Sequence, residues 1–154
     1  MEPVLVYPIG HVRGGRRAVE DDAWGPVVSR IELDTGVVGA AATQGLDAFS
    51  HLEVVYVFDR VDPATVCTGA RHPRGRTDWP EVGILAQRAK DRPNRLGVTV
   101  CELRGVDGPS IEVAGLDAVD GTPVVDVKPY LPGFAPRGEV RQPPWAEELM
   151  RGYW

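Results

Sequence analysis

Glycine and proline interrupt this chain so often that only short secondary-structure elements fit between them. Of the 154 residues, 18 are glycine and 14 are proline, together about a fifth of the chain. Proline removes a backbone donor and glycine weakens the interior of helices and strands, so both residues concentrate in turns. Between these turns helical periodicity is scarce, whereas short β-branched runs are frequent. The spacing therefore favours a mainly β fold.

Seven short runs are predicted to be strands because they are rich in β-branched residues or alternate in polarity. They span residues 4–7, 27–33, 54–58, 82–85, 98–103, 111–114 and 124–127. Asp107-Gly108 predicts a hairpin between the fifth and sixth runs, with a loop longer than two residues. Many short strands favour a barrel or a sandwich over a doubly wound sheet. The prediction is a small β-barrel, closed or partly open, with a short helical turn.

Two further segments are predicted to be helical, and the second belongs to a C-terminal tail. Residues 44–52 are expected to form one or two turns, and residues 144–150 begin at a proline and precede Gly152. We expect a body over residues 4–136 and a tail over 137–154. The tail is rich in large apolar side chains, namely Trp145, Leu149, Met150, Tyr153 and Trp154. It is expected to dock, either as a strap over a sheet edge or as a lid over a site.

The charge distribution points to one basic segment on an acidic chain. The chain has a net charge of −5, which argues weakly against a nucleic-acid partner. Residues 71–95, however, hold seven Lys and Arg against three Asp and Glu, a net charge of +4. This segment indicates either a local anionic ligand or a solvated loop. Neither a signal peptide nor an apolar span of membrane length is visible, so a cytoplasmic protein without membrane contact is expected.

Common catalytic and nucleotide-binding motifs are missing from the sequence. We find neither a P-loop nor a G-x-G-x-x-G turn, and no G-x-S-x-G elbow. The three histidines have no metal-like spacing, so no metal site is expected.

Three segments carry unusual combinations of polar residues. Residues 49–53 place a histidine at the mouth of an apolar strand, where it could bind a ligand or serve the structure. Residues 87–97 gather four cations beside Pro, Asn and Gly, which suits a carboxylate or a phosphate but also a surface turn. Residues 115–130 surround a strand with acids, a Thr, a Lys and a Tyr. Their tight turn could wrap a ligand or be capped by its own aspartate.

Taken together, these segments resemble the TsaA-like or TrmO family. The motifs are F-S-H-L at 49–52, H-P-R-G at 72–75, A-x-R-x-x-x-R-P-N-x-x-G at 86–97 and L-D-x-x-D-G-T-P-V-x-D-x-K-P-Y at 116–130. The resemblance covers roughly residues 4–135. It implies a single-sheet β-barrel that binds S-adenosylmethionine (SAM) and works as a homodimer. It also implies methylation of the exocyclic amine of threonylcarbamoyl-adenosine beside the tRNA anticodon.

The resemblance also implies which residues contact the cofactor. The matching positions are His51, Leu52, Arg88, Val98, Asp120, Gly121, Thr122 and Pro123. An amine acceptor needs a group that takes its proton, and the candidates are Asp22, Asp117 and Tyr130.

Two alternatives to the tRNA substrate stay open. Where the family has a basic P-R-Q segment, this chain has Glu20-Asp21-Asp22, which favours a small nucleoside-like or other metabolite as acceptor. The second alternative is a SAM-binding module without catalysis.

Overall fold

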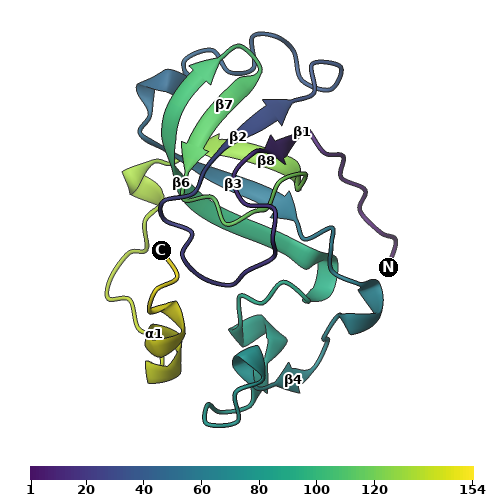
Figure 1. The fold of residues 1–154 in the computed structure, drawn as a ribbon, viewed down its shortest axis with the longest axis vertical. Coiled ribbons are helices and arrows are strands. Elements are labelled where there is room, and N and C mark those ends of the chain that lie inside the picture. Colours follow the sequence, from purple (N-terminus) through teal and green to yellow (C-terminus); the bar gives the residue numbers. More distant parts are fainter.

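The computed structural model describes residues 1–154, and six of its strands close into a barrel (Figure 1). These strands are β1 (Gly10–Arg13), β2 (Val28–Leu33), β3 (His51–Val57), β6 (Leu96–Asp107), β7 (Ser110–Ala114) and β8 (Pro123–Pro129). Every neighbouring pair is antiparallel, in the order β1-β2-β7-β6-β3-β8, and β8 pairs back onto β1. The predicted mainly β barrel is therefore confirmed, and it is closed.

The barrel interior is filled by alternate residues of the strands. On β3 the side chains of Leu52, Val54 and Tyr56 are almost fully buried, while their neighbours on the strand are more exposed. This alternation follows from the pleat, which turns successive side chains to opposite faces of a sheet. The core cluster holds eleven buried residues: Val12, Ile31, Leu52, Val54, Tyr56, Cys101, Ile111, Val113, Leu116, Ala118 and Val124.

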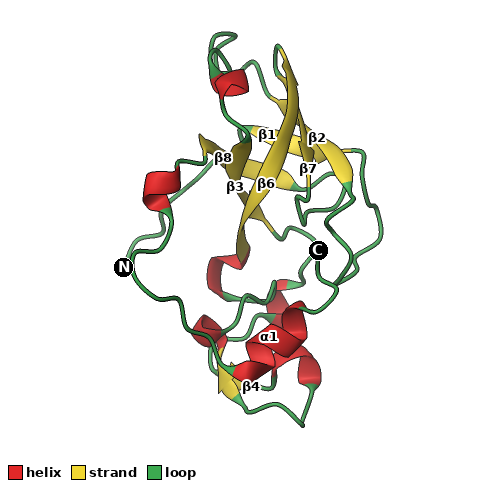
Figure 2. Cartoon of the chain, turned by 90° about the vertical axis from the view of Figure 1, so that its left-hand side faces the viewer, coloured by secondary structure: helices red, strands yellow, loops and turns green.

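A second, smaller body lies at one end of the barrel (Figures 1 and 2). It combines the two-stranded sheet of β4 (Ala70–Arg71) and β5 (Val82–Gly83) with helix α1 (Pro144–Met150). Trp79 joins them, because its indole N–H donates to Glu148 at 2.9 Å and its ring lies 6.3 Å from that of Trp145. Trp79 is only 5% exposed. Short 3-10 turns complete the chain at Leu46–Ala48, Pro63–Thr65, Pro73–Gly75, Ile84–Ala86, Pro93–Arg95 and Pro132–Phe134.

The structure confirms helix 144–150 and corrects three other predicted elements. Residues 4–7 form no strand; they are exposed and have no partner strand, since pairing begins at Gly10. Residues 44–52 are helical only at Leu46–Ala48, because the last two join the ladder between β3 and β6. Of residues 82–85, only Val82–Gly83 is a strand.

The predicted hairpin is present, but its loop is shorter than expected. Strand β6 continues to Asp107, which pairs with Ser110, so the connection is the two residues Gly108 and Pro109. Gly108 has a φ of +56°, a conformation that favours glycine. None of the helices is long and apolar enough to cross a membrane.

Candidate active site

An open cleft of about 1180 Å³ lies between the barrel and the second body. Its floor is formed by β3 and β6, and its walls by the basic loop of residues 85–94 and by the C-terminal tail. Single-ligand pockets usually measure roughly 300–1000 Å³. The cleft is therefore large enough for a nucleoside-sized cofactor together with part of a second molecule.

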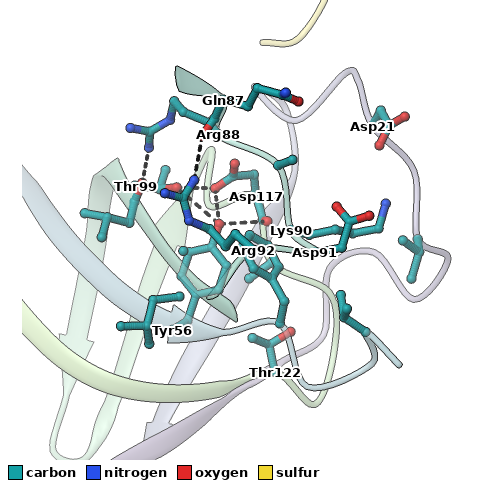
Figure 3. Close-up of a pocket in the computed structure, with 18 of the residues that line it drawn as sticks. Asp21, Tyr56, Gln87, Arg88, Lys90, Asp91, Arg92, Thr99, Asp117 and Thr122 are labelled. Carbon is teal, nitrogen blue, oxygen red and sulfur yellow. Dashed lines mark hydrogen bonds between the residues drawn. The ribbon is translucent and has the colours of Figure 1, made fainter. Parts of the chain in front are cut away.

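The Asp117 carboxylate is the centre of the polar network in this cleft (Figure 3). One of its oxygens accepts hydrogen bonds from the hydroxyl groups of Tyr56, at 2.8 Å, and of Thr99. The other oxygen accepts from the hydroxyl of Tyr153 in the tail. Burial is the main cause that raises the pKa of both tyrosines, and the negative charge of Asp117 is the second cause. Both phenols therefore stay protonated and keep donating to a single fixed carboxylate.

Tyr56 reaches Asp117 because Gly97 leaves room for its ring. Tyr56 on β3 pairs directly with Gly97 on β6. A Cβ atom at position 97 would lie 2.5 Å from two ring carbons of Tyr56. Glycine is thus required here by a close side-chain approach.

The basic loop places Arg88 beside this network. Arg88 donates to the carbonyl oxygen of Val98 on β6. Its positive charge offsets part of the rise in the pKa of Tyr153. The loop is held by Asp91, whose two oxygens accept hydrogen bonds from the guanidinium of Arg71. This interaction lowers the pKa of the Asp91 carboxyl. Asp91 and Arg71 thus hold the loop in place. Arg88 itself donates only to a backbone carbonyl oxygen and has no carboxylate partner.

The turn at residues 120–123, which was predicted to wrap a ligand, forms hydrogen bonds mainly to β1 and to the residue that follows it. The Asp120 carboxylate accepts from the backbone N–H of Gly14 at 2.9 Å, and Gly121 donates its own N–H to Val12 at 2.7 Å. Gly121 has a φ of +89°. Only Thr122 of this turn lines the cleft, whereas Pro123 pairs with His11 on β1.

The remaining predicted site residues lie outside the cleft of their own chain. His51 is exposed at the other end of β3 from Tyr56, about 17 Å away at ~3.3 Å per residue. Leu52 belongs to the barrel core. The backbone N–H of Tyr130 donates to His51 at 2.9 Å, which places Tyr130 at the same remote end. Asp22 pairs with Arg74 at 2.9 Å near the rim.

The structure thus brings together Arg88, Val98, Asp117 and Thr122 among the residues predicted from sequence. Sequence reasoning missed Tyr56 and Thr99, although their strands alternate clearly. A tyrosine at an inward position of a strand signals a buried hydroxyl that needs a partner. Tyr153 was predicted to dock, and the tail does dock, with Trp145, Leu149 and Tyr153 partly buried.

These features define a small β-barrel domain with a large cleft, in which a polar network surrounds Asp117. The family model for the tRNA-methyltransferase O N-terminal domain matches residues 22–135, and the chain belongs to this family. A probable S-adenosyl-L-methionine-binding protein from Methanothermobacter thermautotrophicus is 39% identical over 135 residues, covering 82% of this chain and 90% of the relative.

Longer relatives share the same domain. The tRNA (adenine(37)-N6)-methyltransferase of Escherichia coli is 41% identical over 97 residues, which cover 60% of this chain and 41% of that protein. The crystal structure of TrmO from Pseudomonas aeruginosa superposes with a TM-score of 0.70 at 27% identity, covering 91% of this chain and 62% of that one. The chain therefore spans less than half the length of the E. coli relative and less than two thirds of the solved one.

Proposed function

We propose that this protein is a SAM-dependent N-methyltransferase that acts on an exocyclic adenine amine in tRNA, at threonylcarbamoyl-adenosine beside the anticodon. The observation that carries the proposal is the Asp117 carboxylate, which is held by three hydroxyl groups inside a cleft that also contains Arg88. The name of the E. coli relative, a tRNA (adenine(37)-N6)-methyltransferase, supports the same activity and substrate.

The charges along the cleft suit the three charged groups of SAM. Arg88 has no carboxylate partner and would hold the methionine carboxylate, while Glu53 and Asp117 offer negative charge to the ammonium and sulfonium groups. Val98 and Thr122 would contact the rest of the cofactor from the barrel side. When bound, SAM supplies a methyl group that its positive sulfur has already activated.

The protein itself would orient the acceptor and take up its proton. As the amine nitrogen gains the methyl group it loses a proton, and Asp117 is the one predicted proton acceptor that lines the cleft. Asp22 and Tyr130 remain predictions of lower rank because they lie outside it. Alignment of the two reactants can lower the barrier by about 7–11 kcal/mol, and proton transfer to a placed base adds about 10²–10⁴-fold.

Arg88→Ala is expected to weaken SAM binding about tenfold or more, because a charge-assisted hydrogen bond is worth about 1.5–3 kcal/mol. Isothermal titration calorimetry on the purified chain measures this change. Arg137→Ala is the matched control, since Arg137 is exposed and does not line the cleft. Equal SAM affinity in Arg88→Ala and wild type would remove Arg88 from the cofactor site.

A small nucleoside-like metabolite is the second candidate acceptor. Glu20 and Asp21 line the cleft, and negative charge there disfavours the phosphate backbone of a folded RNA. Mass spectrometry of tRNA and metabolites from a deletion strain separates the two acceptors. Loss of the methyl group from tRNA supports the first candidate; accumulation of an unmethylated metabolite with normal tRNA supports the second. SAM binding without any change in either supports a non-catalytic module.

We further propose that the chain works as a cytoplasmic homodimer, with residues 4–136 as the SAM-binding body and 137–154 as its tail. The family resemblance implies that His51 contacts the cofactor, yet His51 is exposed and lies outside the cleft of its own chain. A second subunit would be needed to bring it to a cleft.

A further inference from the structure

The C-terminal tail is anchored to the body beside the cleft through backbone as well as side chains. The N–H groups of Ala23 and Trp24 donate to the carbonyl oxygens of Gly152 and Tyr153, at 2.9 and 2.8 Å. Gly25 lies against Trp154, since a Cβ atom at position 25 would be 2.8 Å from the carbonyl carbon of Trp154. The path of the last residues is therefore fixed by the loop that precedes β2.

This path directs the side chain of Tyr153 toward Asp117. The ring of Tyr153 is partly buried and packs edge-to-face on Trp154, with ring centroids 4.8 Å apart. Its hydroxyl donates to the Asp117 oxygen that neither Tyr56 nor Thr99 contacts. The barrel thus holds one oxygen of the carboxylate and the tail holds the other.

We propose that Tyr153 is a positioning residue, whose hydroxyl fixes the second Asp117 oxygen so that the carboxylate faces the acceptor amine. The proposal rests on the proposed methyltransferase function and assigns the tail a part in that function. A carboxylate held by one oxygen can still turn about its Cβ–Cγ bond, whereas donors on both oxygens fix its plane. Productive geometry in an active site needs reacting groups held within a fraction of an ångström.

The tail also forms one wall of the cleft. Trp145, Leu149, Met150 and Trp154 line the cleft together with Tyr153. With the tail docked, the cleft still measures about 1180 Å³, so the tail bounds the space without filling it. A strap that only covered a sheet edge would not need to place a hydroxyl on a carboxylate inside the cleft.

Tyr153→Phe separates positioning from simple strapping, because it keeps the ring and removes only the hydroxyl. We expect kcat for methyl transfer to unmethylated tRNA to fall about tenfold, with SAM affinity and melting temperature close to wild type. Tyr7→Phe is the control, since Tyr7 is 72% exposed and lies outside the cleft. An active wild type with unchanged kcat in Tyr153→Phe overturns the proposal, as does a lowered melting temperature with unchanged kcat.

A second measurement tests, independently of methyl transfer, whether the Tyr153 hydroxyl holds the Asp117 carboxylate. The ¹³C resonance of the Asp117 carboxyl group should shift in Tyr153→Phe and stay in place in Tyr7→Phe. An unchanged Asp117 resonance overturns the inference whatever the activity. Absence of both SAM binding and transfer in the wild type would overturn the proposed function and the positioning role with it, while the resonance would still report the contact between Tyr153 and Asp117.

Discussion

Replacing Asp117 with asparagine is expected to reduce methyl transfer about 10²–10⁴-fold, the usual contribution of a placed general base. Asparagine has nearly the same shape but does not take up a proton at neutral pH. Its amide oxygen can still accept hydrogen bonds from Tyr56 and Thr99, so the fold should persist. Single-turnover transfer from methyl-labelled SAM measures the chemical step directly.

Asp126→Asn is the matched control for this change. Asp126 lies on β8 outside the cleft and pairs with Lys128, so its replacement should leave transfer unchanged. If Asp117→Asn transfers the methyl group at the wild-type rate, Asp117 is not the proton acceptor, and Asp22 or Tyr130 would have to be tested in its place.

Gly97→Ala is expected to destabilise the protein by about 1–3 kcal/mol, the usual effect of overpacking a core. The new methyl group would lie 2.5 Å from the Tyr56 ring, which is only 1% exposed and has little room to move. Displacement of the ring would also take the Tyr56 hydroxyl away from Asp117. We therefore expect loss of stability and of methyl transfer together.

Denaturant unfolding measures the change in stability, and Gly105→Ala is its control. Gly105 lies on the same strand, and a Cβ atom there would meet nothing within 4 Å. Combining Gly97→Ala with Tyr56→Ala should recover part of the loss, since the clash disappears with the ring. Full additivity of the two changes would show that Gly97 and Tyr56 do not interact.

Elements with local signals were predictable from the sequence, and elements that depend on a distant partner were not. Helix α1 begins at Pro144 as expected, because proline fits the first helical position. The run at residues 4–7 has strand-like composition but no partner strand, and composition alone does not reveal this. His51 and Leu52 fall within the predicted helical turn because the sequence does not show their pairing partners, Glu102 and Cys101, which lie 51 and 49 residues further along the chain.

The same distinction between local signals and distant contacts holds for the candidate site. The family motifs pointed to Arg88 and Thr122, and both line the cleft. Asp120 is a predicted cofactor contact that does not line the cleft of its own chain, and its carboxylate accepts a hydrogen bond from the backbone N–H of Gly14. Tyr153 contacts Asp117 across 36 residues of chain, so only the folded structure connects the tail to the site.

The most direct test of the central claim is to locate bound SAM by NMR, following backbone and side-chain resonances during a SAM titration of the full chain. We expect the largest shifts at Arg88, Val98, Asp117 and Thr122, which line the cleft between the barrel and the second body. The smaller cavity at Leu46 and Val127 serves as the internal reference and should show little change. Shifts confined to that smaller cavity, or none at saturating SAM, would contradict the account.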